Sequence, residues 1–137
     1  RREPEKEPTM AEVKRAVHRL LSPHLQIYRW HIPMLTSILT RITGNGIVVG
    51  AVIVIAWLAA AAAGPEAFAT VDGLVRSWLG LLVLIGIAWA VWYHFLAGLR
   101  HLYYDAGKGL DLPTAELLGK ACLGGSAVLT VLTLLIV

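Results

Sequence analysis

The chain has 137 residues, of which 57% are hydrophobic and only 15% are charged, and its mean hydropathy is +0.67. A soluble globular domain carries about a quarter charged residues, so this composition excludes an ordinary soluble protein and is typical of a membrane protein. The formal net charge is +3, yet no basic patch interleaved with aromatic residues occurs, and we therefore expect no nucleic-acid partner.

Residues 1–36 form an N-terminal segment that precedes the membrane domain. The pattern of residues 12–21 predicts a short amphipathic helix that ends before Pro23, because a residue before proline is disfavoured in helix. Residues 25–34 then mix large apolar side chains with polar ones. Tyrosine and tryptophan favour the membrane–water interface, so we expect this stretch to lie at the membrane surface.

Three long runs that are almost free of charge follow. They are residues 42–65, 77–99 and 121–137. Each is close to the roughly 20 residues that a helix needs to cross the hydrocarbon core. Helices are therefore predicted near residues 41–64, 75–103 and 115–137. The fold class is an all-α membrane protein, with a transmembrane domain of three helices over residues 37–137.

Lysine and arginine are unevenly distributed between the segments that connect these helices. Before the first helix stand Arg1, Arg2, Lys6, Lys14, Arg15, Arg19, Arg29 and Arg41, and between the second and third stand Arg100, Lys108 and Lys120. The connection between the first two helices carries only Arg76. The positive-inside rule therefore places the N-terminus and the second connection on the cytoplasmic or matrix side.

His94 lies within the second predicted helix, on the order of 9 Å inside the boundary marked by Arg100. An imidazole at this depth is disfavoured unless it is coordinated or hydrogen-bonded. Two interpretations stay open: a structural histidine bonded to a neighbouring helix, or a ligand to haem or another metal centre. Gly98, four residues further on, leaves room for a flat group or a helix to approach.

A six-coordinate haem on His94 needs a second ligand from elsewhere. His101 is on nearly the same face but about 10 Å away along the helix, too far to share one iron with His94. The remaining histidines lie outside the predicted helices, so a partner subunit is the better candidate.

Ser37 and Arg41 are four residues apart, so on a helix they share one face. A hydroxyl and a guanidinium that converge near the membrane surface suit a carbonyl or anionic oxygen of a ligand. The alternative is that Arg41 anchors to a lipid phosphate and Ser37 only caps or packs the helix. Spacing alone leaves both open.

Two longer patterns surround these residues. The first runs Ser22-Pro23-His24-Leu25-Gln26-Ile27-Tyr28, then Trp30, Pro33-Met34 and Ser37-x3-Arg41-x-Thr43-Gly44. The second is His94-x3-Gly98-Leu99-Arg100-His101-Leu102-x-Tyr104-Asp105-x-Gly107. In this order they resemble the two signatures of the large cytochrome b membrane anchor of succinate dehydrogenase, respiratory complex II. Two positions depart from the family: Leu20 follows Arg19 where proline is usual, and Thr40 replaces a histidine associated with the haem propionates and the quinone region.

The resemblance implies a helical bundle formed with a second membrane-anchor subunit, which together hold a flavoprotein subunit and an iron–sulfur subunit on the membrane. It implies that His94 is an axial ligand of the iron of haem b, with the opposite ligand from the second anchor. It further implies a ubiquinone site, lined by Ser37 and Arg41 and walled by Leu25, Trp30 and Met34, where electrons from succinate reach ubiquinone. The membrane would be the bacterial cytoplasmic (inner) membrane or the mitochondrial inner membrane.

The chain alone is not expected to be an enzyme, because it lacks any flavin or iron–sulfur motif, and we assign it no catalytic residue. Two other functions stay open. One is the anchor of a fumarate reductase-type complex that works with quinol in the opposite direction. The other is a non-redox membrane scaffold in which His94 only bonds to a neighbour.

Overall fold

The computed structural model describes residues 22–137, and this part of the chain is helical without any strand. Its elements are the 3-10 turn η1 (His24–Gln26) and the α-helices α2 (Ile32–Ala63), α3 (Pro65–Val75), α4 (Trp78–Asp105) and α5 (Leu112–Ile136). Helices α2, α4 and α5 are long and apolar enough to cross a membrane. The predicted all-α membrane fold with three spanning helices is thus confirmed. The helix predicted at 12–21 lies outside the described residues.

Helix α2 begins at Ile32, well before the start predicted near residue 41, so the expected boundary between residues 36 and 37 falls inside a helix. Pro33 occupies the first turn, where its missing N–H has no intrahelical partner to lose. His31 just before it is extended, with φ −111° and ψ 144°. An uncharged run marks the part of a helix in hydrocarbon, whereas backbone hydrogen bonding continues into the polar interface. The sequence-based start was therefore too late.

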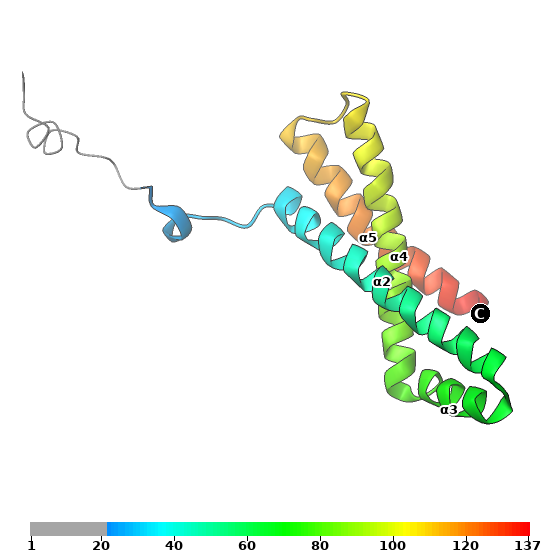
Figure 1. Ribbon diagram of the computed structural model, residues 1–137. Helices are drawn as coiled ribbons and strands as arrows, with labels where there is room; N and C mark the ends of the chain where they lie inside the picture. Colours follow the sequence, from blue (N-terminus) through cyan, green and yellow to red (C-terminus); the bar gives the residue numbers. More distant parts are fainter. Residues whose placement is uncertain (1–21) are drawn as a thin grey trace, which may run out of the picture.

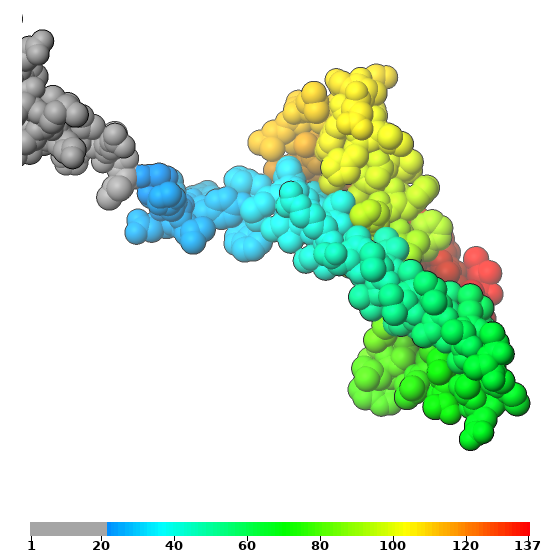
Figure 2. All heavy atoms as spheres, in the orientation of Figure 1, coloured from blue at the N-terminus to red at the C-terminus, as the bar shows by residue number. Residues whose placement is uncertain are grey.

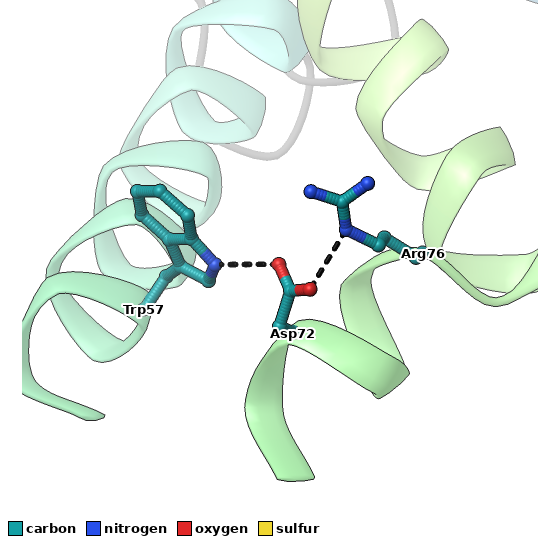
Figure 3. Close-up of polar contacts among 3 residues, drawn as sticks. All are labelled: Trp57, Asp72 and Arg76. Atoms are coloured by element: carbon teal, nitrogen blue, oxygen red, sulfur yellow. Dashed lines mark hydrogen bonds and ion pairs between the residues drawn. The ribbon is translucent and has the colours of Figure 1, made fainter. Parts of the chain in front are cut away.

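Helix α3 was not predicted and lies in the connection between the first two spanning helices (Figure 1). Gly64 separates it from α2 with a φ of 130°, a conformation that favours glycine. The indole Nε1 of Trp57 on α2 donates to Oδ1 of Asp72 at 3.1 Å, and Nε of Arg76 donates to Oδ2 at 2.7 Å (Figure 3). One carboxylate thus ties the short helix to the end of α2.

The three long helices pack around a crossing of α2 and α4, with α5 on the other side of α4 (Figure 1). Small residues allow this approach: a Cβ on Gly50 would lie 2.7 Å from Ile87, and one on Gly46 would lie 3.7 Å from Ala90. On α5, a Cβ on Gly119 would lie 2.8 Å from Ile32. Close packing through small residues is the usual way in which helices associate in lipid.

Helix α5 starts at a loop that turns back from the end of α4. Asp111 caps it, since its carboxylate accepts from the Thr114 amide at 3.0 Å. The hydrogen bonds from Thr114 lower the pKa of Asp111. This loop and the start of α2 lie at the same end of the bundle, and α3 lies at the opposite end (Figure 1).

The buried centre of the chain is small and contains polar side chains. Tyr93, Ala97 and Cys122 form its apolar part, and Thr36 and Ser126 are fully buried beside it. Most large apolar side chains of α2, α4 and α5 stay exposed on the outer faces. Such surfaces fit lipid or a partner subunit rather than water.

Candidate functional site

His94 projects from α4 towards α2 and forms the centre of the site. Its Nδ1 lies 3.1 Å from the carbonyl oxygen of Thr40 and 3.3 Å from Oγ1 of Thr43. A carbonyl oxygen only accepts, so Nδ1 carries the proton in the neutral ring. The Thr43 hydroxyl donates to the carbonyl of Leu39 at 2.8 Å, which leaves its lone pairs for the imidazole. The tautomer therefore has its lone pair on Nε2.

This hydrogen bond was one of the two interpretations open for His94 from the sequence, and it is compatible with the other. Histidines that bind metals usually donate their second ring N–H to a carbonyl, a carboxylate or water, which fixes the ring and its tautomer. Among the described residues, we find no hydrogen-bond partner for Nε2 of His94. The ring is thus held by one nitrogen and has the other available as a ligand.

The space around the ring is asymmetric. A Cβ on Gly44 of α2 would lie 3.2 Å from Cε1 of His94, so glycine is what lets the ring lie against that helix. A Cβ on Gly98, one turn along α4, would meet nothing within 4 Å. The half-buried imidazole is therefore closely packed on the α2 side and has open space beside it on its own helix.

Within residues 22–137, His94 is a single candidate nitrogen ligand. No group of three or more His, Cys, Asp or Glu side chains that could hold a metal occurs in residues 22–137. A bare ion needs several protein ligands, whereas haem iron needs only one or two axial ones from the protein. The oriented imidazole of His94 could serve as one such ligand.

Ser37 and Arg41 lie on α2, one turn apart, and Gly44 continues the same stripe at the next turn. Gly44, at the end of this stripe, lies against the His94 ring, whereas neither Ser37 nor Arg41 forms a hydrogen bond with that ring within residues 22–137. Ser37 is half-buried and Arg41 is exposed. No ion pair involving Arg41 is formed within the described part of the chain, so its guanidinium is available to a ligand, a lipid or another subunit.

The three predicted apolar wall residues are not gathered at this stripe. Leu25 and Trp30 are 86% and 74% exposed, in a segment (residues 22–31) that stands away from the helices (Figure 2). Met34 is half-buried in the first turn of α2, and the Tyr28 hydroxyl contacts its sulfur. Within this single chain, only Met34 lies on the same helix as Ser37 and Arg41.

A family model described as "Succinate dehydrogenase/Fumarate reductase transmembrane subunit" matches residues 15–133. The chain belongs to this family.

Individual members are similar over most of their length. The chain is 54% identical over 127 residues to the succinate dehydrogenase cytochrome b556 subunit of Paracoccus denitrificans, across 93% of this chain and 97% of that protein. It is 39% identical over 121 residues to the mitochondrial succinate dehydrogenase cytochrome b560 subunit of Sus scrofa, across 85% of this chain and 68% of that protein. It is 30% identical over 125 residues to the succinate dehydrogenase cytochrome b556 subunit of Rickettsia conorii, across 90% of this chain and 98% of that protein. The resemblance drawn from the two sequence patterns is thus confirmed.

In this transmembrane subunit, sequence reasoning missed two residues beside the site and a third, Arg100, that lies apart from it. Thr43 contacts the His94 ring, Tyr93 donates its hydroxyl to the Thr36 carbonyl at 2.9 Å, and Arg100 is buried although charged. Thr43 and Arg100 stand in the patterns quoted above, and Tyr93 directly precedes His94. Their roles depend on which helix each one faces, and a single helical pattern does not show that.

Thr40, the departure from the family pattern, also has a defined position. Its hydroxyl donates to the carbonyl of Thr36 at 2.8 Å, within its own helix. Its carbonyl, rather than its side chain, accepts from His94. The contact with the imidazole is therefore independent of the residue type at position 40.

Proposed function

We propose that this subunit binds haem b through Nε2 of His94, together with a second membrane-anchor subunit, and forms part of the ubiquinone site of a succinate:ubiquinone oxidoreductase. The observation that carries the proposal is the hydrogen bond from His94 Nδ1 to the Thr40 carbonyl, which directs the unprotonated nitrogen away from α2. The cytochrome b names of the relatives and their common assignment to succinate dehydrogenase support this direction of catalysis.

Haem supplies a one-electron redox centre within the membrane. The chain contributes a fixed axial nitrogen, because Thr40 and Thr43 hold the ring from one side and Gly44 lets it lie against α2. A hydrogen-bonded imidazole is a more basic ligand than a free one. In this proposal the second anchor subunit would supply any further protein ligand to the iron.

Ser37 and Arg41 act on the quinone. Reduction places negative charge on a quinone oxygen, which a guanidinium stabilises and a hydroxyl hydrogen-bonds. Their stripe adjoins His94 through Gly44, so a quinone bound there lies near the haem side of α2. Leu25, Trp30 and Met34 supply apolar walls once residues 22–31 pack against α2 or a neighbouring subunit.

Succinate is oxidised elsewhere in the complex, on the flavoprotein subunit, and the iron–sulfur subunit passes the electrons on. This chain anchors both to the bacterial cytoplasmic membrane or the mitochondrial inner membrane. Its N-terminal segment and the loop between α4 and α5 face the cytoplasm or matrix, where the lysines and arginines are concentrated.

The test is the reduced-minus-oxidised absorption spectrum of the complete purified complex, with His94→Ala compared to His101→Ala. His101 is exposed near the end of α4, so its loss is a matched control. We expect a b-type spectrum in the parent and the control, and its loss or conversion in His94→Ala. An unchanged spectrum in His94→Ala, with partner subunits still co-purifying, excludes His94 as the ligand. Absence of haem from the parent complex favours the scaffold function.

A further inference from the structure

Arg100 is a buried charge for which the proposed function has no use. It is only 6% exposed, and its Nε is buried without a hydrogen-bond partner among the described residues. Its Cζ lies 5.8 Å from the ring centroid of Tyr104, so the guanidinium extends towards the end of α4 and the membrane surface. A buried guanidinium is costly unless an anion or several acceptors pair with it.

The carboxylates of the described chain do not pair with it. Asp72 binds Arg76, Glu116 lies 4.0 Å from Lys120, and Asp111 caps α5. Glu66 lies in the first turn of α3, at the opposite end of the bundle (Figure 1). Asp105, although close in sequence, is exposed and forms no ion pair with Arg100. An anionic partner for the Arg100 guanidinium is thus not found in residues 22–137.

Arg100 lines a groove between α4 and α5, which we call the α4–α5 groove. Its volume is about 260 Å³, and its walls are almost entirely apolar, with Leu96, Leu99 and Tyr103 on one side and Leu118 and Cys122 on the other. From Leu96 to Tyr103 the groove extends about 10 Å along the helix axis. It is an elongated apolar channel with one cation near the interfacial end.

The groove is separate from the His94 site. Leu96, Leu99 and Tyr103, which line the groove, lie on the face of α4 opposite His94, whose ring contacts α2. The groove is formed with α5 instead. A ligand on Nε2 of His94 and an anion in the α4–α5 groove therefore approach α4 from different sides.

We propose that the α4–α5 groove binds one anionic phospholipid of the surrounding bilayer, with its phosphate against Arg100 and one acyl chain along Leu96 and Leu99. Charge complementarity selects the phosphate, since guanidinium binds it with paired hydrogen bonds. The apolar walls of the groove favour contact with the acyl chain of the lipid. The depth is also suitable, because Tyr103 and Tyr104 mark the interface where headgroups lie. Such a lipid links α4 to α5.

The experiment counts phospholipids that remain on the complete complex, purified in mild detergent, by native mass spectrometry. The variants are Arg100→Gln and Lys120→Gln; Lys120 lies at the same end of the bundle but is 62% exposed and serves as the matched control. We expect the parent and Lys120→Gln to retain one phospholipid more than Arg100→Gln. Equal counts in all three overturn the proposal.

Single lipids are then added back to the delipidated parent complex, to test whether the groove recognises the phosphate. Dioleoylphosphatidylglycerol should bind at least tenfold more tightly than dioleoylglycerol, which lacks the phosphate, and inorganic phosphate should not replace it. Equal binding of both lipids, or saturation by inorganic phosphate, contradicts the proposal.

Two further readouts keep the result interpretable. Ala121→Phe fills the groove while keeping Arg100 in the chain, and it should lose the same lipid, which covers the case in which Arg100→Gln does not assemble. The haem spectrum of Arg100→Gln should be unchanged. If Arg100→Gln instead loses haem or the second anchor subunit and keeps the lipid count, Arg100 contacts that haem or subunit, and the lipid site is overturned.

Discussion

Nδ1 of His94 on α4 lies 3.1 Å from the backbone carbonyl of Thr40 on α2. Because the acceptor belongs to the main chain, the bond orients the ring whatever side chain stands at position 40. The threonine that replaces the family's usual histidine therefore leaves the orientation of the candidate ligand intact.

This relationship gives a prediction for a pair of isosteric variants. Thr43→Val removes a hydroxyl 3.3 Å from Nδ1, and Thr40→Val removes a hydroxyl that donates to the Thr36 carbonyl and forms no hydrogen bond with His94. An acceptor on Nδ1–H makes the imidazole more basic and favours oxidised haem. We expect a small upward shift of the haem midpoint potential in Thr43→Val and none in Thr40→Val, measured by redox titration. A downward shift in Thr43→Val would contradict this geometry.

A second prediction compares two glycines around the ring. Gly44→Val should displace His94, since even a Cβ there lies 3.2 Å from Cε1, and should lower the haem content of the complex. Gly98→Val meets nothing within 4 Å in this chain, so any loss of haem would come from a group outside it. If haem occupies that space, both variants lose haem; if Gly98→Val retains full occupancy, the haem lies elsewhere around the ring. Haem is quantified per complex from the absorption spectrum.

The quinone site is tested by side-chain removal on the α2 stripe. Ser37→Ala should lower ubiquinone reduction by the loss of one hydrogen bond, worth about 1 kcal/mol. Arg41→Ala should cost more, because hydrogen bonds to charged groups are worth roughly 1.5–3 kcal/mol. Succinate oxidation with a soluble artificial acceptor should be retained in both, which serves as the internal control. Normal quinone turnover in both variants would assign Arg41 to lipid anchoring.

A fourth prediction concerns the far end of the bundle. Asp72→Asn keeps an oxygen for the Trp57 indole but removes the ion pair with Arg76, whose side chain is 76% exposed. Exposed ion pairs contribute about 0.2–1 kcal/mol, so the midpoint of thermal unfolding should change little. Asp72→Ala also removes the acceptor of the half-buried Trp57 indole, so it should cost about 1 kcal/mol more. An effect of Asp72→Asn as large as that of Asp72→Ala would show that the charge, rather than the Trp57 contact, holds α3.

The sequence by itself determined the membrane class, the three spans and the family. These are sums over local properties: an uncharged run of sufficient length is helical in lipid whatever it packs against, because its backbone must bond internally. It also singled out His94, since an imidazole at that depth requires a partner. The start of α2 and the helix α3 were missed because charge patterns report hydrocarbon depth, not backbone hydrogen bonding.

Only the tertiary structure decided which nitrogen of His94 is unprotonated and which stripe of α2 lies beside it. Both follow from the close approach of α4 to glycines of α2, which brings the Thr40 carbonyl within hydrogen-bond distance. The burial of Arg100 likewise depends on where α5 crosses α4. Helical periodicity places residues on a face, but the face acquires its chemistry from the helix packed against it.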